Sequence, residues 1–348
     1  MSGLVETKLI GNLSIIIVTW NGDELLVNCL ASLNKTYGTL PEIVVVDNAN
    51  SSATRKIISD FPNCIYVPSP RNLGFSGGNN LGLSLCSREY ILLLNNDTAF
   101  HEDSISPLLQ YLEANPLVAV AQGTLRLVRQ GDVLDACGIN LMLCGKLHQL
   151  HCTDAVSTTK LKATPIFAAK GAFLVFRSSI LKELGNTLFH DFFFNNAEDV
   201  DFCHRVWLTG HEVHFVPTPP IDHLQSATLS RISLNNVLAQ TFANMLFSFL
   251  TNFGPRGLFT IVPTFIIYNF LIFLRFTLAF KFDITKQYCG AVRIFFANAH
   301  RLWGIRRQVQ KSRKISDSVL FNKTLYHPPR SYWLNLGKMF FAARFHCR

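Results

Sequence analysis

The stretch EYILLLNNDT, residues 89–98, decides the fold, because it joins an apolar run to a group of polar side chains. The aliphatic run at 91–94 predicts a strand covered on both faces, as in a parallel sheet. Ligands of open α/β sheets gather beyond the carboxyl ends of such strands, where Asp97 is expected. Two roles are open for its carboxylate: holding Mg²⁺ or Mn²⁺ against a diphosphate, or capping the next element. The remainder of the chain has to distinguish them.

A parallel strand–helix–strand unit is predicted before this stretch. Residues 13–19 and 43–46 are apolar and β-branched, as buried strands are, and residues 24–33 between them have helical spacing. Strands joined in this way run parallel with a right-handed crossover, so Asp47 should lie at the same sheet edge as Asp97. Its carboxylate suits a nucleobase or ribose donor, although Asp47 considered alone is better explained as a helix cap.

A glycine-rich segment, RNLGFSGGNNLG at residues 71–82, follows a third predicted strand at 65–67. We expect a loop here, because glycine permits positive φ and a close approach of the backbone to a ligand. Arg71 and Asn80 offer polar contacts within it. The spacing of dinucleotide-binding glycines and the lysine of a Walker A loop are both absent from the segment. Plain turn chemistry remains an alternative explanation for it.

Three acids stand within four residues of the segment FFFNNAEDVDFCHRV, residues 192–206. Glu198 and Asp199 are expected in the first turn of a helix, where the helix dipole favours negative charge. Asp201 should pair with Arg205 one turn later. Capping suffices to explain Glu198, whereas the additional strand-end acids favour a functional role for Asp199. Repulsion from its acidic neighbours would raise the pKa of Asp199 and make it a better base, although Arg205 opposes the effect.

Two further features lie on either side of these acids. Residues 168–177 predict a turn of small residues that leads into a strand, before a helix at 178–184. Gly171 in this turn has two equally supported roles, as a wall for a bound sugar or as a point of close packing. After a strand at 213–217, His223 is expected beside the strand-end carboxylates, where a histidine is a suitable metal ligand.

Hydrophobicity and charge are both unevenly distributed. The chain of 348 residues is 49% hydrophobic and can bury a large core. Residues 281–348 hold 14 Lys and Arg against 2 Asp and Glu, a balance of +12 that suits an anionic membrane. No aromatic and basic recognition motif supports nucleic acid as a partner. Residues 258–274 carry no charge but include Pro263 and are short for a membrane span. Interfacial helices, a hairpin or a span all remain open, with zero or two crossings favoured.

The cysteines and the amino terminus point to the same cellular compartment. Nine cysteines are scattered without a CxxC pair or a metal-binding spacing. The amino terminus has no signal-peptide pattern and is expected to lead through Glu6 and Lys8 straight into the first strand. Both features predict a reducing, cytoplasmic setting.

Five short motifs together resemble family 2 glycosyltransferases in their order and spacing, and most closely the bacterial rhamnosyltransferase-like branch. They are TWN at 19–21, VDN at 46–48, the glycine-rich segment from Asn72 to Asn80, LNND at 94–97 and EDVD at 198–201. The resemblance covers residues 12–230 and implies an α/β fold of the GT-A type, with a nucleotide-binding sheet flanked by helices. Residues 1–235 would form this catalytic domain, and residues 236–348 a hydrophobic, mainly helical region that associates with the membrane.

The resemblance also implies roles for individual residues. Asp199 matches the catalytic base, and Gly171 and Glu198 would face the acceptor or the donor sugar. Asp97 and His223 match the site for Mg²⁺ or Mn²⁺, although Asn95 replaces the first acid of the family's metal-binding motif. The residues expected at the nucleotide-sugar are Thr19, Asn21, Asp47, Arg71, Asn80, Asn96 and Asp97.

The activity that the resemblance implies is inverting transfer of a sugar, with rhamnose as a candidate, from a dTDP- or UDP-sugar to a lipid-linked or polysaccharide acceptor. One carboxylate would take the proton from the acceptor hydroxyl, and a cation would stabilise the leaving diphosphate. Such a hexosyltransferase for cell-envelope glycans would work at the cytoplasmic face of the inner (plasma) membrane. The alternative is a catalytically impaired nucleotide-sugar-binding partner in a glycan assembly complex, which Asn95 alone supports.

Overall fold

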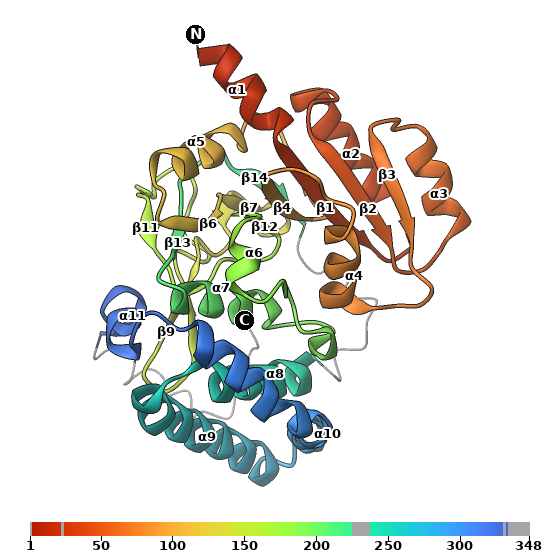
Figure 1. Ribbon diagram of the computed structural model, residues 1–348. Coiled ribbons are helices and arrows are strands. Elements are labelled where there is room, and N and C mark those ends of the chain that lie inside the picture. The colour runs from red at the N-terminus through yellow and green to blue at the C-terminus, as the bar shows by residue number, and fades with distance from the viewer. Residues whose placement is uncertain (1, 22–23, 225–236, 330–331, 333–348) are drawn as a thin grey trace.

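The computed structural model describes residues 2–21, 24–224, 237–329 and 332. The predicted turn at 20–23 is therefore described only in part. The predicted domain boundary at 235 and most of the basic tail beyond 329 lie outside the described residues. Figure 1 shows an α/β body with α1 (Ser2–Gly11) at one end and three long helices, α8 to α10, at the other.

The body is built on one mixed sheet with the strand order β11-β13-β6-β12-β4-β1-β2-β3. Because β1 to β4 run parallel, Asp47 and Asp97 follow strands that end at one edge, as predicted. β4 pairs in parallel with β1 but antiparallel with β12, so the prediction of a parallel environment is wrong on that side. The strands are β1 (Leu13–Thr19), β2 (Glu42–Asp47), β3 (Cys64–Pro68), β4 (Tyr90–Asn95), β6 (Val118–Gln122), β11 (Thr164–Pro165), β12 (Phe173–Arg177) and β13 (Glu212–Phe215).

Helices connect the parallel strands. They are α2 (Glu24–Tyr37), α3 (Ser52–Ser59), α4 (Gly74–Leu83) and α5 (Ser106–Ala114). The prediction that the amino terminus enters β1 directly is wrong, because α1 precedes the strand and buries Ile10 in the core cluster that contains Leu13. The apolar residues at the end of α1 thus supply a helix contact that strand periodicity alone does not predict.

The glycine-rich segment is the helix α4 and not the predicted loop. Its glycines let the helix lie close to the sheet. A Cβ atom at Gly78 would lie 2.7 Å from Val18 of β1, and one at Gly82 would lie 2.6 Å from Ile16. Real Cβ atoms do not approach so closely, so these two positions need glycine for packing. Gly74 at the start of the helix has φ +68° and is the position where left-handed backbone is required.

A small four-stranded sheet lies beyond the end of β4 and has the order β5-β14-β7-β8. In this sheet His223 of β14 pairs with Thr98 of β5, so the chain folds back to place His223 next to Asp97. A separate hairpin is formed by β9 and β10. The bounds are β5 (Thr98–Ala99), β7 (Leu125–Leu127), β8 (Val133–Leu134), β9 (Ile139–Leu141), β10 (Leu147–Gln149) and β14 (Ile221–His223).

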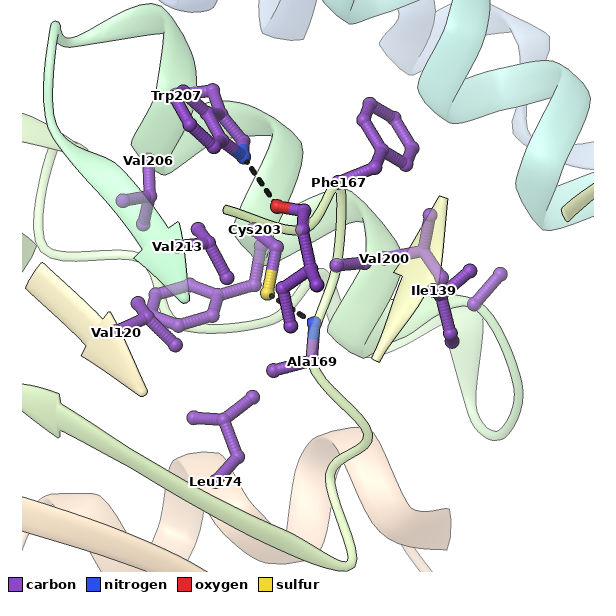
Figure 2. Packing of buried hydrophobic residues seen from close by; sticks show 14 of the residues in the cluster. Val120, Ile139, Phe167, Ala169, Leu174, Val200, Cys203, Val206, Trp207 and Val213 are labelled. Atoms are coloured by element: carbon purple, nitrogen blue, oxygen red, sulfur yellow. Dashed lines mark hydrogen bonds between the residues drawn. The ribbon is translucent and has the colours of Figure 1, made fainter. Parts of the chain in front are cut away.

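The acidic motif begins helix α7 (Glu198–Leu208), which the core holds against the sheet. Figure 2 shows Trp207 donating its indole N–H to the Ile166 carbonyl at 3.0 Å, and the Ala169 N–H donating to the Cys203 sulfur at 3.4 Å. Apolar side chains of β6, β12 and β13 pack around these contacts. The predicted ion pair is confirmed, since Arg205 Nε lies 2.7 Å from Asp201 Oδ2. This packing fixes where the first turn of α7 presents its carboxylates.

The described part of the chain from Val237 onwards consists mainly of helices, and Gly254 separates α8 from α9. α8 packs against α7 and α10, and its Asn252 donates to Asp201 at 2.9 Å. The bounds are α8 (Val237–Asn252), α9 (Pro255–Leu278), α10 (Phe282–Ser312) and α11 (Asp317–Thr324), and the remaining short helices are α6 (Ile180–Glu183), η1 (Val128–Gln130) and η2 (Asp191–Phe193).

Candidate active site

A cavity of about 500 Å³ opens at the carboxyl edge of β1 and β4. The lining residues come from eight segments of the chain, namely the ends of β1 and β4, Asn48 after β2, the start of α4, the turn at 170–172, the segment at 194–199, β14 and the start of α8. Among the predicted site residues, the lining includes Thr19, Asn96, Asp97, Gly171, Glu198, Asp199 and His223. The fold therefore brings the three residues most central to the prediction, Asp97, Asp199 and His223, to one cavity.

Asp97 and His223 form one side of this cavity together with a carboxylate that the sequence analysis did not identify. His223 Nε2 lies 3.5 Å from Asp97 Oδ1, and His223 Nδ1 lies 2.9 Å from Asp135 Oδ2. Asp135 is fully buried, and its other oxygen accepts from Lys170 Nζ at 2.6 Å. The four side chains thus form a chain of alternating charge that runs from the cavity into the protein.

This arrangement shifts the pKa of two of its members. Burial alone would lower the pKa of His223, but its contacts with Asp135 and Asp97 outweigh burial and raise the pKa to about 9. Burial would likewise raise the pKa of Asp135, but His223 and Lys170 hold the pKa of that carboxyl well below its usual range. Asp135 therefore remains ionised and orients the imidazole through Nδ1.

The side chains fit a divalent cation that takes further ligands from its substrate. Asp97 Oδ1 is buried and accepts no hydrogen bond from the described residues. His223 turns Nε2 towards that oxygen while a carboxylate holds Nδ1, the usual arrangement behind a metal-ligating histidine. Among the described residues, no group of three or more His, Cys, Asp or Glu side chains is arranged to hold a metal. With one carboxylate and one imidazole from the protein, a divalent cation here would take most of its ligands from substrate phosphates and water.

Asp199 and Glu198 form a second acidic group at the cavity. Asp199 Oδ2 accepts from the Gly171 N–H at 2.9 Å, and Oδ1 accepts from the Val200 N–H at 2.8 Å. Burial raises the pKa of Asp199 and outweighs these two hydrogen bonds and the charge of Lys170. The predicted direction of the shift is therefore right, whereas its main cause is burial and not repulsion between acids.

Glu198 is the more strongly perturbed of the two acids. It is buried, and its Oε2 has no hydrogen-bond partner in the described part of the chain. Burial, followed by repulsion from Asp199, raises the pKa of Glu198 well above its usual range. A carboxyl in this state donates a hydrogen bond while protonated, so it differs chemically from Asp199, whose two oxygens both accept.

The segment that leads into these acids has an unusual backbone. Phe194, Asn196 and Ala197 all have positive φ, at 57°, 69° and 65°. Left-handed backbone is uncommon for residues other than glycine, and strained backbone clusters at functional sites. This backbone conformation sets the direction in which α7 starts, and so it determines where Glu198 and Asp199 lie.

Hydrogen bonds from two helices hold this strained segment. At the start of α4, the Ser76 N–H donates to the Phe194 carbonyl at 3.0 Å, and the Phe75 N–H donates to Asn195 Oδ1 at 2.6 Å. From α8, the buried Asn244 amide donates to the carbonyls of Phe193, Asn195 and Asn196 at 2.8 to 3.1 Å. A helix of the carboxyl-terminal half therefore takes part in positioning the acids.

Four of the predicted nucleotide-binding residues do not line this cavity. Asn21 is exposed with φ 55°. Asp47 is fully buried, and its oxygens accept from the N–H groups of Ala49 and Ser51 and from the Tyr66 hydroxyl. These contacts tie the end of β2 to the turn before α3, whose N-cap residue is Ser51.

Arg71 and Asn80 line a second hollow of about 550 Å³, which borders the first at Asn72 and Phe194. The Asn80 amide is already engaged, because it donates to the Phe189 carbonyl at 2.8 Å and to Asp191 Oδ1 at 2.6 Å. It ties α4 to the segment before η2.

The sequence analysis missed Lys170, which lines the cavity, and Asp135 and Asn244, which support it. Lys170 lies in the predicted small-residue turn, where a single cation among Ala and Gly was a usable signal. Asp135 follows the two-residue strand β8, which is too short for periodicity to reveal. Their contacts span 35 and 88 positions of sequence, which no local pattern encodes.

Sequence models of known families match the chain over the regions that build the cavity. The model described as Glycosyl transferase family 2 matches residues 14–133, and that described as Glycosyl transferase family group 2 matches residues 90–282, more than half of the chain. The chain belongs to glycosyltransferase family 2. The resemblance inferred from the five motifs is thereby confirmed.

Individual relatives of this family 2 chain are distant. The low-salt glycan biosynthesis hexosyltransferase Agl10 of Haloferax volcanii is 28% identical over 214 residues, which cover 58% of this chain and 63% of that protein. The rhamnosyltransferase WbbL of Escherichia coli strain K12 is 25% identical over 228 residues, covering 58% of this chain and 80% of that protein. The match to the Haloferax protein thus spans less than two thirds of its length.

A solved structure confirms the predicted GT-A type of α/β fold for this family 2 chain. The crystal structure of GalNAc-T7 with UDP, GalNAc and Mn²⁺ has a TM-score of 0.55 and 14% sequence identity, covering 71% of this chain and 48% of that one. At this identity the likeness concerns the fold.

Proposed function

We propose that this chain is an inverting glycosyltransferase that moves a sugar from a nucleotide-sugar to a glycan or lipid-linked acceptor. Membership of family 2 supports sugar transfer, and the Haloferax and Escherichia relatives, a hexosyltransferase and a rhamnosyltransferase by name, support a role in glycan synthesis. A dTDP-rhamnose-like donor is our specific candidate, with other dTDP- or UDP-sugars as its competitors.

The observation that carries the proposal is that Asp199 and the Asp97–His223 pair line one cavity. Inverting transfer needs a carboxylate that takes the proton of the acceptor hydroxyl as that hydroxyl attacks the anomeric carbon. It also needs positive charge at the leaving diphosphate. The two groups are separate in sequence and meet at the edge of the sheet, where each can act on a different end of the same donor.

Asp199 is the proposed base. Each of its oxygens accepts a single backbone N–H, so lone pairs remain for an acceptor hydroxyl, while the hydrogen bonds from Gly171 and Val200 fix the carboxylate in place. Its raised pKa increases its affinity for the proton that it would receive. Glu198 at the same helix start is proposed to contact a sugar hydroxyl.

Asp97 and His223 are the proposed ligands of Mg²⁺ or Mn²⁺. When bound, such a cation would stabilise the negative charge that develops on the leaving nucleoside diphosphate. Mn²⁺ is present in the solved GalNAc-T7 structure, which supports a divalent cation here. Lys170 also lines the cavity, and its ammonium, which pairs with Asp135, adds positive charge there.

We place the reaction at the cytoplasmic face of the membrane, where nucleotide-sugars are made available. Among the described residues one helix, α9, is long and apolar enough to cross a membrane, which by itself is weak support for membrane association. The basic carboxyl-terminal half supports an anionic lipid surface as the neighbour of this region.

The test is a screen of nucleotide-sugars with the purified chain, in the presence of Mg²⁺, Mn²⁺ or a chelator. We expect one donor to release its nucleoside diphosphate, with release abolished by the chelator. A donor that binds tightly in calorimetry without any turnover, with or without candidate acceptors, would instead assign the chain to the catalytically impaired class that Asn95 suggests. Absence of both binding and turnover for all donors would overturn the proposal.

A further inference from the structure

α9 and α10 form a helical hairpin at the end of the molecule opposite α1 (Figure 1). The two helices are joined by polar contacts near the turn. The Thr277 and Thr285 hydroxyls lie 3.3 Å apart, and the Tyr288 hydroxyl donates to Asn269 Oδ1 at 3.4 Å. α10 also packs along α8, so the hairpin is attached to the body by one face and leaves the other face open.

The open face of the hairpin is strongly apolar. On α9, the exposed residues Ile267, Phe270, Leu274 and Leu278 recur at intervals of three and four and so form one stripe. The stripe continues through Phe280 at the turn, which is 77% exposed. On α10, exposed apolar residues at positions i, i+4 and i+11 share one face, and they are Val292, Phe296 and Trp303. Large exposed apolar patches on a protein mark an interaction surface.

Positive charge flanks this apolar face. Between positions 237 and 316 the sequence contains 11 Lys and Arg and a single acid, Asp283. Arg293, His300 and Arg307 are spaced by seven residues and form a stripe beside the apolar stripe of α10, and all three are exposed. Apolar residues with Trp on one face and basic residues on the next are typical of helices that lie in a membrane interface.

The packing of α9 argues against a membrane span. The first half of the helix is fixed to the body, where Ile261, Val262 and Phe265 are buried and Thr264 Oγ1 donates to the Leu143 carbonyl at 2.7 Å. Only residues 266–278 extend beyond these buried positions, a length of about 20 Å in an α-helix. The hydrocarbon core of a bilayer is about 30 Å thick, so this part of α9 is too short to cross it.

We propose that the α9–α10 hairpin docks in the plane of an anionic lipid bilayer. The apolar stripes enter the boundary between headgroups and acyl chains, and the basic stripe of α10 contacts anionic headgroups. The in-plane docking proposal deepens the membrane association proposed above, because it assigns the surface involved and argues against a span. It does not depend on sugar transfer. The docked face would orient the cavity with respect to a lipid-linked acceptor.

The test is flotation of the full chain with vesicles of phosphatidylcholine alone or of phosphatidylcholine with phosphatidylglycerol. We expect flotation with the anionic vesicles and at least tenfold less bound protein for the double variant Phe270→Glu, Phe280→Glu. The matched control is Leu117→Glu, because Leu117 is 65% exposed but lies before β6 on the body. Arg293→Glu with Arg307→Glu should reduce binding to anionic vesicles alone. A double variant that floats like the unmodified chain would overturn the proposal.

Two further measurements separate the alternatives. Alkaline carbonate should extract the chain from cell membranes, and its retention in the membrane fraction would overturn in-plane docking in favour of a span.

Without lipid the chain should sediment as a monomer. A dimer that Phe270→Glu disrupts would assign the face to a second copy of the chain and overturn the proposal. Turnover of a soluble donor should be unchanged in the double variant. If the unmodified chain binds vesicles but turns over no nucleotide-sugar, the result would count against the proposed function and leave the docking proposal standing.

Discussion

At the scale of single residues, burial and neighbouring charges give the carboxyl groups at the cavity different protonation states. Asp135 is held ionised by a histidine and a lysine, whereas burial favours the protonated forms of Glu198 and Asp199. One side of the cavity thus keeps a fixed negative charge that orients His223, and the other side holds acids ready to exchange a proton.

Asp135→Asn tests the orienting role. The substitution keeps the shape of the side chain but removes the charge that faces His223 Nδ1 and Lys170 Nζ. Loss of such a supporting hydrogen bond typically weakens metal binding by about 10- to 100-fold, and we expect this loss in a Mn²⁺ titration. Asp222→Asn is the control, because Asp222 lies in the same strand as His223 but pairs with Arg126 and His101. Equal Mn²⁺ affinity in both variants would contradict the assignment.

Glu198→Gln tests the buried acid through the pH dependence of stability. The raised pKa means that the folded chain binds this proton more tightly than the unfolded chain, whose glutamate has a pKa of about 4.3. The stabilisation is complete below that pH and is lost as the pH rises through the folded pKa. Glutamine does not ionise, so the variant should have a higher free energy of unfolding than the parent chain at neutral pH, and this gain should disappear near pH 4.

Glu183→Gln provides the control of opposite sign. Contacts with Lys314 first, and then with His211, hold the pKa of Glu183 below its usual range. Its stabilisation is present at neutral pH and is lost as the pH falls, so this variant should be less stable than the parent chain at neutral pH. Denaturant unfolding of both variants over the same pH range measures the two effects. If both substitutions changed the free energy of unfolding at neutral pH in the same direction, the two acids would not differ in the way described.

At the scale of elements, the amino-terminal strands were predictable and α4 was not. β1 and β2 are covered on both faces, so their composition alone marks them. The glycines of α4 have low helix propensity and suggested a loop, but Gly78 and Gly82 serve the contact between helix and sheet, which is a tertiary effect. The same limit applies to the site. Asp97, Asp199 and His223 follow from strand and helix ends, whereas Asp135 and Asn244 act through contacts distant in sequence.

Asn244→Ala tests whether α8 positions the acidic segment. The loss of three hydrogen bonds to the strained backbone should let Asp199 move, and a shift of about 1 Å can cost on the order of 100-fold in rate. We expect slower transfer with unchanged donor affinity, measured well below the unfolding temperature. Asn298→Ala is the control, since that amide donates within its own helix to the Ile294 carbonyl. A rate equal to that of the control would limit Asn244 to a structural role.

At the scale of the whole molecule, the carboxyl-terminal helices carry the proposed membrane surface and are also part of the body that holds the acidic segment. α8 contributes Asn244 and Asn252 to the surroundings of α7, and Phe249 and Phe253 belong to the main hydrophobic core. The apolar content that predicted a membrane region from sequence therefore has two uses. The spacing of apolar residues could not separate the buried residues from the exposed ones, because both groups are equally apolar.

Deletion of residues 237–348 should consequently do more than release the chain from membranes. It would expose the core around Phe249 and leave the buried Asp201 without its partner Asn252. Removal of several buried aromatic residues costs about 3–5 kcal/mol each, which exceeds the stability of a typical domain. We expect an aggregated or protease-sensitive product in limited proteolysis. A truncated chain that is soluble and binds donor would establish the amino-terminal part as an independent domain.

The central claim is that Asp199 takes the proton of the acceptor while other groups hold the donor. The most direct test measures transfer rate and donor affinity side by side on folded Asp199→Asn. Asparagine preserves the shape of the side chain but cannot accept the proton, so we predict a fall of about 10²- to 10⁴-fold in rate with donor affinity unchanged. Undiminished transfer by Asp199→Asn would contradict the account, and loss of donor binding would move Asp199 to the donor site.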